Sequence, residues 1–192
     1  MTEALVTALA AALAARSRVV IPPPGKTVAA VLVPLLAIAG EPSLLFTRRS
    51  SLLPHHQGQV AFPGGRHEPG EDPDLATTAL REAQEEIGLD PAHVRLLGAL
   101  DDIETSATRF VITPFVGVVP HPYDFLPSPD EVDLIFTVPL AALTAPDALR
   151  QEVWDFGGRK VPIDVYPFEG HVIWGATQRI TRNLLAVLDG LS

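Results

Sequence analysis

The chain has 192 residues, of which 47% are hydrophobic and 19% charged, and it contains no cysteine. This composition excludes disordered and fibrous proteins and fits one sizeable core, so we expect a single domain over residues 1–192. The formal net charge of -9 disfavours nucleic acid as a partner. Without cysteine, disulfides, thiolate zinc sites and cysteine nucleophiles are impossible, and the reducing cytoplasm is the expected compartment.

The N-terminal region, 1–25, combines a helical run with the proline-rich spacer VIPPPG. Residues 4–15 (ALVTALAAALAA) are good helix formers, and Glu3 stands where a signal peptide carries positive charge. We therefore expect an added N-terminal helix. Residues 28–40 are apolar but contain Pro34 and are shorter than the roughly 20 residues of a spanning helix, so they predict a buried strand and no membrane partner.

Short apolar runs separated by turn residues continue along the chain. They predict strands at 28–39, 43–47, 59–62, 94–100, 110–119 and 132–138. One helix is predicted to begin near Asp72-Pro73 and to end at Gly88, and a second to cover about 175–189. This order favours an α/β or α+β domain with a mixed sheet. Four aromatic residues are expected in the core rather than at a ligand: Trp154, Phe156, Phe168 and Trp174.

The charged residues are unevenly distributed. Residues 68–90 contain eight acidic side chains and one basic one, whereas 44–67 contain three arginines, three histidines and no acid. Glu82 and Glu86 lie one turn apart on the predicted helix, with Glu85 close to them. The residues alone leave two interpretations open, a solvated acidic face or a site for Mg²⁺ or Mn²⁺, which prefer oxygen ligands.

The run GGRHEPGEDPDLATTALREAQEEIGL, at 64–89, resembles the Nudix box, the signature of hydrolases that cleave a diphosphate linked to another moiety. REAQEEIGL matches the second half of that motif without a gap. The resemblance implies an α/β/α sandwich with a mixed sheet. It further implies three metal-binding carboxylates, a backbone ligand and an orienting arginine: Glu82, Glu85 and Glu86, Gly65, and Arg81.

The box departs from its usual spacing at one point. Nine residues separate Glu71 from Arg81, whereas the usual box has about seven between its first glutamate and the Arg-Glu pair. An insertion between loop and helix accounts for the difference. Glu71 is the expected first glutamate on this alignment, and its role depends on where the insertion lies.

The run LLFTRRSSLLPHHQGQVAFPGG, at 44–65, resembles the additional motif of the coenzyme A pyrophosphatase branch, so that motif and box together occupy 44–90. The matching residues are Leu44, Leu45, Thr47, Arg49, Leu53, His56, Gly58 and Gln59. The resemblance implies hydrolysis of coenzyme A to 3′,5′-ADP and 4′-phosphopantetheine. A basic, histidine-containing block also suits a substrate that carries a diphosphate and a further phosphate.

The expected substrate-binding residues come from this block and the box: Arg48, Arg49, His56, Gln59 and Arg66. Each could instead be an ordinary surface or turn residue. The proton acceptor could be a box glutamate, Glu131 before the strand at 132–138, or His121. Two other functions stay open: hydrolysis of another nucleoside diphosphate derivative, and a non-catalytic nucleotide-binding module. The sequence gives no prediction of oligomeric state.

Overall fold

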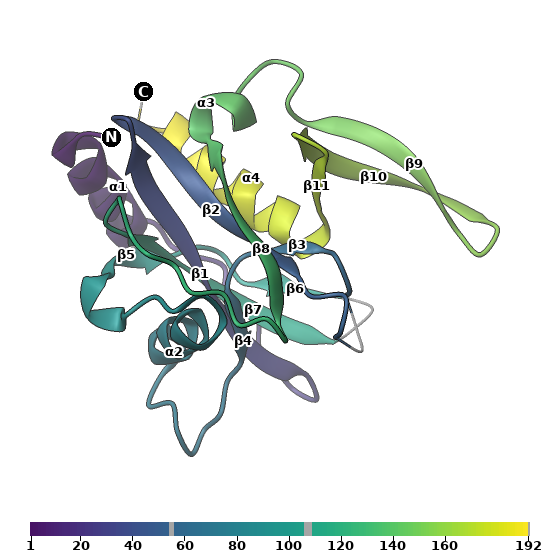
Figure 1. The fold of residues 1–192 in the computed structure, drawn as a ribbon, viewed down its shortest axis with the longest axis horizontal. Coiled ribbons are helices and arrows are strands. Elements are labelled where there is room, and N and C mark those ends of the chain that lie inside the picture. The colour runs from purple at the N-terminus through teal and green to yellow at the C-terminus, as the bar shows by residue number, and fades with distance from the viewer. Residues whose placement is uncertain (54–55, 106–108, 192) are drawn as a thin grey trace.

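The central sheet is built around two parallel strands, β1 (Thr27–Ile38) and β7 (Phe110–Val118), in the computed structural model (Figure 1). The structure describes residues 1–53, 56–105 and 109–191. Within these ranges eight strands form the sheet, and the other pairings are antiparallel, so the sheet is mixed as predicted. The remaining strands are β2 (Glu41–Arg49), β3 (Val60–Ala61), β4 (Gly64–Arg66), β5 (Arg95–Ala99), β6 (Ile103–Glu104) and β8 (Val132–Pro139).

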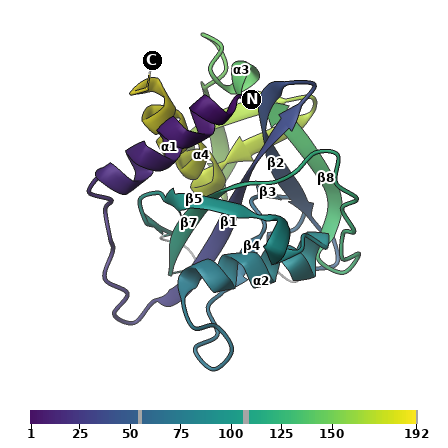
Figure 2. The ribbon, with the colours of Figure 1, turned by 90° about the vertical axis from the view of Figure 1, so that its left-hand side faces the viewer.

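Helices cover both faces of the sheet, which confirms the predicted layered α+β fold (Figure 2). α2 (Leu75–Ile87) covers one face, and α1 (Glu3–Ala15) and α4 (Gly175–Asp189) cover the other. The buried side chains accordingly form two clusters, one on each side of the sheet. The short helix α3 (Leu140–Leu143) follows β8, and a single 3₁₀ turn, Pro91–His93, follows α2.

Pro34 lies inside β1 and marks a change of partner along one edge of that strand. β4 pairs with β1 up to Val31, and β2 pairs with it from Leu35 onward. Proline has no N–H to donate, so a position between two partner strands accommodates it without an unpaired donor. The strand continues through the proline, and the short strand β4 is placed between β1 and α2.

Residues 150–174 form a second, three-stranded antiparallel sheet that the sequence analysis did not predict (Figure 1). Its strands are β9 (Arg150–Phe156), β10 (Arg159–Phe168) and β11 (His171–Trp174). The hairpin projects from the body of the molecule, so Phe156 is 51% exposed and the prediction that it lies in the core was wrong. Trp154, Phe168 and Trp174 are partly buried rather than core residues.

None of the helices in the described part of the chain is long and apolar enough to span a membrane.

Candidate active site

Helix α2 is held close to the sheet by small side chains. Ala79, Ala83 and Ile87 recur at four-residue spacing and are fully buried against the face that carries Ala30. The helix begins after Asp74, whose carboxylate accepts a hydrogen bond from the N–H of Thr77, and it ends at Gly88 in the left-handed conformation. The helix was predicted to begin near Asp72-Pro73 and begins two residues later; the expected cap, Asp72, was wrong, because its carboxylate binds Arg81 instead.

The glycine pair at 64–65 allows the backbone of β4 to contact the carboxylates of α2. A Cβ on Gly65 would overlap the carboxylate of Glu82, and a Cβ on Gly64 would overlap the carbonyl oxygen of Ala30 in β1. The N–H of Gly64 donates a hydrogen bond of 3.1 Å to Oε2 of Glu86. Only glycine leaves this space, so the FPGG sequence brings bare backbone against two helix carboxylates.

Glu86 is 4% exposed, and Nη1 of Arg49 lies 3.8 Å from its Oε1. Burial raises the pKa of Glu86 to about 8, against the Gly64 hydrogen bond and the charge of Arg49, which favour ionisation. Burial also raises the pKa of Glu82 above its ordinary value, opposed by Arg81. The positive charge of the neighbouring arginines therefore does not offset the cost of burying these two carboxylates in their ionised form.

Arg81 holds the acidic residues of the box in place through four contacts. Its guanidinium group donates to both oxygens of Asp72, at 2.9 and 3.0 Å, and Nη1 donates to Glu85 at 2.9 Å. Nη2 lies 3.1 Å from Oε1 of Glu82. Asp72 is buried and also accepts from the hydroxyl of Thr78. The hydrogen bonds from Arg81 hold the pKa of Asp72 well below its usual range.

The sequence analysis missed Asp72 as the partner of Arg81. Glu71, the expected first glutamate of the box, is exposed in the turn that joins β4 to α2. The longer spacing indicated that the alignment could shift here, but an Asp-Pro pair before a helix also has the pattern of a cap. Local pattern could not distinguish a cap from an ion pair.

The residues present fit a divalent cation, although no three His, Asp or Glu side chains in the described ranges converge as a complete metal site. Glu82 and Glu86 carry carboxylate oxygens, the atoms that Mg²⁺ and Mn²⁺ prefer, and a positive charge beside them would offset the burial that raises their pKa values. Gly65 keeps the space beside Glu82 free of a side chain. Glu85 is more than half exposed and bonds to Arg81, so it lies at the edge of this group.

Glu131 is brought to the same group by the loop of residues 119–131. The N–H of Ser128 donates to the carbonyl oxygen of Glu86 at 2.9 Å, and the N–H of Ser50 donates to that of Glu131 at 2.8 Å. The charge of Glu131 contributes to the raised pKa of Glu82 and Glu86. Glu131 therefore comes from a loop whose backbone is hydrogen-bonded to α2.

Arg48 and Arg49, whose roles the sequence did not distinguish, point to opposite faces of β2. Successive residues of β2 point to opposite faces, and Leu45 belongs to the cluster under α2 whereas Phe46 belongs to the other one. Arg49 shares the α2 side and contacts Glu86, and within the described ranges its buried Nε has no hydrogen-bond partner. Nε of Arg48 instead lies 4.0 Å from the carboxylate of Asp133 in β8.

The remaining candidate residues lie in three different places. The N–H of Arg49 donates to the carbonyl oxygen of Gln59, and Nδ1 of exposed His56 lies 2.8 Å from Oε1 of Gln59. Arg66 is exposed at the end of β4, and its carbonyl oxygen accepts from Arg81 at 3.2 Å. His121 is exposed in the loop of residues 119–131. His55 lies outside the described residues.

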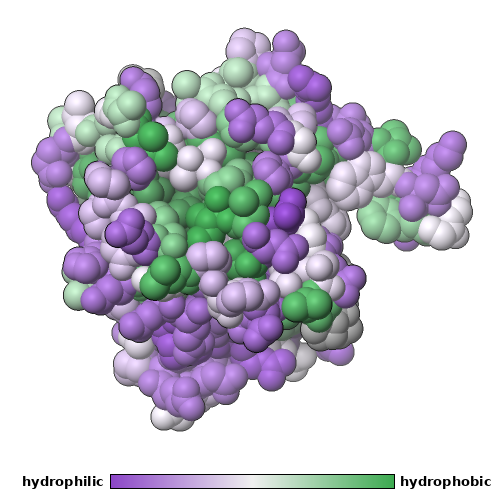
Figure 3. Space-filling view, viewed as in Figure 1, coloured by the Kyte–Doolittle hydropathy of each residue, from purple (hydrophilic) through white to green (hydrophobic). Residues whose placement is uncertain are grey.

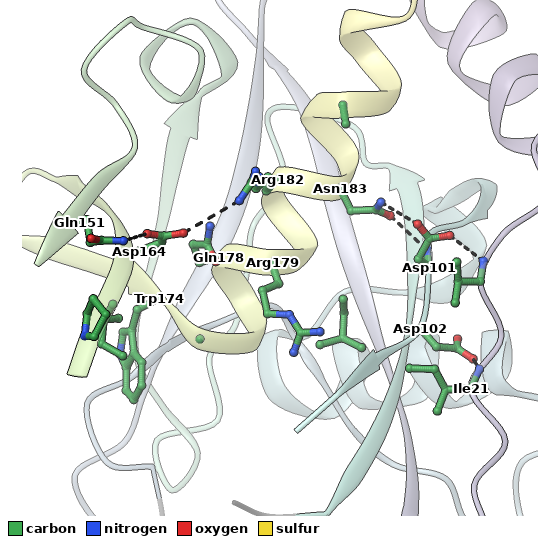
Figure 4. Close-up of a pocket in the computed structure, with 16 residues that line it drawn as sticks. Ile21, Asp101, Asp102, Gln151, Asp164, Trp174, Gln178, Arg179, Arg182 and Asn183 are labelled. Atoms are coloured by element: carbon green, nitrogen blue, oxygen red, sulfur yellow. Dashed lines mark hydrogen bonds and ion pairs between the residues drawn. The ribbon is translucent and has the colours of Figure 1, made fainter. Parts of the chain in front are cut away.

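A groove of about 820 Å³ runs along α4 in the opposite layer of the molecule (Figure 4). It lies between the β9–β10 hairpin and the N-terminal segment, and its lining includes Trp174, Gln178 and Arg182. None of the residues predicted for the site lines it. The predicted box residues therefore lie away from this groove, at α2.

Comparison with known proteins gives the same family as the site. The NUDIX domain model matches residues 26–156. The uncharacterized Nudix hydrolase NudL of Klebsiella pneumoniae is 40% identical over 167 residues, which cover 81% of this chain and 80% of that protein. NudL of Photorhabdus laumondii is 37% identical over 175 residues, which cover 88% of this chain and 92% of that protein.

Solved structures agree in fold at lower sequence identity. An Ap4A hydrolase of C. elegans in a binary complex superposes with a TM-score of 0.56 at 20% identity, covering 85% of this chain and 98% of that one. A NUDIX hydrolase of Alicyclobacillus acidocaldarius gives a TM-score of 0.55 at 21% identity, covering 85% and 91%. The matched domain and the NudL relatives show that this chain belongs to the Nudix family of hydrolases.

Proposed function

We propose that this Nudix hydrolase, which acts on a nucleoside diphosphate derivative, cleaves the diphosphate bond of coenzyme A to give 3′,5′-ADP and 4′-phosphopantetheine. The observation that carries the proposal is the position of Arg49. A residue of the motif that resembles the coenzyme A branch lies beside the box residue Glu86, and its buried Nε has no hydrogen-bond partner among the residues that the structure describes. A phosphate oxygen is the acceptor that such a guanidinium group would bind.

Mg²⁺ or Mn²⁺ is the proposed cofactor, and Glu82, Glu85, Glu86 and the backbone of Gly65 are the groups that would hold it. When bound, the cation neutralises charge on the diphosphate oxygens and lowers the pKa of the attacking water. Arg81 positions Glu82 and Glu85 through its ion pairs and does not need to contact substrate. Ionisation of buried Glu86 is then compensated by positive charge.

Glu131 is the proposed proton acceptor for the attacking water. It comes from a loop bonded to the backbone of Glu86 and lies close enough to raise the pKa values of Glu82 and Glu86. A group on a separate element can accept a proton while Glu82 and Glu86 serve as ligands. His121 is the weaker candidate, because it is exposed and no contact joins it to these carboxylates in the described residues.

The polyanionic half of the substrate is assigned to the basic side of the site. Arg49 would bind the diphosphate, and Arg48, His56, Gln59 and Arg66 would bind the adenosine half and its 3′-phosphate. Arg48 and Arg66 are partly or fully exposed, and His56 and Gln59 lie in the loop that bonds to the backbone of Arg49. A non-catalytic nucleotide-binding module is disfavoured, because such a module has little need for one buried and one partly buried carboxylate with raised pKa values.

Substrate competition tests the proposal. The purified protein with Mg²⁺ or Mn²⁺ is assayed on coenzyme A, its disulfide, NADH, ADP-ribose, diadenosine polyphosphate and nucleoside triphosphates, and kcat/KM is compared. We expect the highest value for coenzyme A or its disulfide, and no turnover by Glu86→Gln. A higher kcat/KM for any other compound would support the alternative, a Nudix hydrolase of another nucleoside diphosphate derivative.

A further inference from the structure

A second groove, of about 450 Å³, lies between β8 and the loop of residues 119–131, on the α2 side of the sheet. Aliphatic side chains of β1 and β2, among them Ile38 and Leu45, form part of its lining, and the rings of Tyr123 and Phe125 come from the loop. Apolar side chains gather near the middle of this face of the molecule (Figure 3). Of the described residues, neither the proposed metal-binding carboxylates nor the arginines of the site line this groove.

One end of the groove lies close in sequence and space to the proposed catalytic residue Glu131. Asp133 lines the groove, follows the proposed proton acceptor Glu131 by two positions, and lies 4.0 Å from Nε of Arg48. The loop on its other side is bonded to the end of α2, because the N–H of Leu126 donates to the carbonyl oxygen of Ile87 at 3.0 Å. A substrate whose diphosphate lies at Glu86 therefore has this groove directly beside one of its two ends.

The charges decide which half of the substrate fits the groove. Among the described residues its lining contains one histidine, His121, one acid, Asp133, and no lysine or arginine. The cations of the site, Arg48, Arg49 and Arg66, lie on β2 and β4 instead. A half that carries a further phosphate belongs beside the cations, because an unpaired phosphate in an apolar groove would lose its hydration without compensation. The groove therefore suits the half of the substrate that carries no charged group besides the diphosphate.

The outer edge of β8 suits an extended chain that contains amides. Five consecutive residues of β8, 133–137, line the groove, so strand backbone as well as side chains faces it. In the described part of the chain β8 pairs with β2 and with no other strand, so its N–H and C=O groups on the outer edge have no strand partner. An extended amide chain can hydrogen-bond to such an edge as an added strand does.

The segment of β8 that lines the groove and the pantetheine arm of coenzyme A have similar lengths. From Asp133 to Thr137 the strand advances by about 13 Å, at roughly 3.3 Å per residue. The arm of coenzyme A, from phosphate ester oxygen to sulfur, has about twelve bonds, as many as four peptide residues, and spans roughly 14 Å when extended. Its two secondary amides and two methyl groups match a strand edge and an aliphatic wall.

We propose that the groove between β8 and the loop of residues 119–131 binds the pantetheine arm of coenzyme A, with the amides along the outer edge of β8 and the methyl groups toward Leu45 and Phe125. This inference rests on the proposed function. It divides the substrate between two regions, with the adenosine half on the basic block and the arm on β8. Selectivity for coenzyme A over other diphosphates then comes from the groove.

Filling the groove tests this assignment. Thr137 is paired with Leu45 across the strands, lines the groove and is partly buried at the sheet edge, so Thr137→Trp fills it, and Phe125→Ala removes one wall. Val153→Trp places the same side chain on the exposed edge strand β9 as a matched control. Melting temperatures establish that each variant is folded. Calorimetry with each product separately, 4′-phosphopantetheine and 3′,5′-ADP, measures binding without turnover.

We expect Thr137→Trp to weaken 4′-phosphopantetheine binding and to raise the KM for coenzyme A by about tenfold or more, with 3′,5′-ADP binding unchanged. Phe125→Ala should also weaken 4′-phosphopantetheine binding, and Val153→Trp should leave the binding of both products unchanged. If the wild type cleaves coenzyme A but both groove variants bind 4′-phosphopantetheine as it does, the groove assignment is overturned and the proposed function stands. A wild type that does not cleave coenzyme A overturns the proposed function itself.

Discussion

The carboxylate of Asp72 receives two hydrogen bonds from the guanidinium group of Arg81, at 2.9 Å from Nε and 3.0 Å from Nη2. The pair is buried on the side of Asp72, and the same guanidinium group contacts Glu82 and Glu85. Asp72 therefore fixes the position of the Arg81 guanidinium group, which in turn positions the carboxylates of Glu82 and Glu85.

Replacing Asp72 by alanine is expected to destabilise the fold by about 3 kcal/mol, because it leaves Arg81 partly buried without its main partner. The kcat should fall as well, since Glu82 and Glu85 lose their fixed positions. Denaturant unfolding and steady-state kinetics measure the two effects. Glu71→Ala is the matched control in the same loop and should change neither; if it behaves like Asp72→Ala, the assignment of Asp72 as the partner of Arg81 is wrong.

The raised pKa of Glu86 predicts an unusual pH dependence in the metal-free protein. A carboxyl group whose pKa is 4.5 ordinarily and about 8 in the folded state keeps a proton that the unfolded chain releases between these values. The folded state is therefore destabilised as the pH rises through this window, by a few kcal/mol at most. Comparison with Glu86→Gln, which cannot ionise, isolates the effect.

Urea unfolding without metal at pH 5.5 and 8.5 measures this dependence. We expect the wild type to lose stability relative to Glu86→Gln between the two values, and Mg²⁺ to restore more stability to the wild type at the higher pH. Equal stability differences at both values would show that Glu86 is already ionised at pH 5.5.

The contact between Gly65 and Glu82 predicts the effect of a single methyl group. Gly65→Ala would push the carboxylate of Glu82 out of its position, so Mg²⁺ should bind more weakly and kcat/KM should fall by about 100-fold. Gly70→Ala lies in the following loop, where a Cβ meets no atom within 4 Å, and should be neutral. Mg²⁺ titration and kinetics of both variants provide the comparison. A neutral Gly65→Ala would remove Gly65 and Glu82 from the metal site.

The alternation of β2 predicts unequal roles for the neighbouring arginines. Arg49→Ala should raise the KM for the diphosphate substrate by about tenfold or more, since a charge-assisted hydrogen bond is worth about 1.5–3 kcal/mol. Arg48→Ala removes a residue whose recorded contact is Asp133, and a smaller increase is expected. The prediction is tested by comparing the KM values of the two variants. A larger effect at Arg48 would reverse the assignment of the two faces.

Much of the fold could be predicted because its signals are local. The helix that ends at Gly88 follows from apolar spacing and a glycine stop, and the last helix was placed at its observed bounds of Gly175–Asp189. The hairpin was missed although Gly157 and Gly158 are a turn signal, because its strands carry many charges and bury little.

The parts of the site that could not be predicted depend on tertiary contacts. Two adjacent arginines are equivalent in sequence until the strand's faces are known, and the acidic run before the helix offers several partners for Arg81. The turn between β4 and α2 decides that Asp72 is buried and that Glu71 is exposed. The groove beside β8 combines residues from four separate segments, so no single motif could indicate it.

The most direct test of the central claim is mass analysis of the products formed from coenzyme A and Mg²⁺ in ¹⁸O-labelled water. The account predicts two products, 3′,5′-ADP and 4′-phosphopantetheine, with one ¹⁸O atom on one of them because a single water breaks the diphosphate bond. Recovery of intact coenzyme A, or of a product that has lost only the 3′-phosphate, would contradict the account.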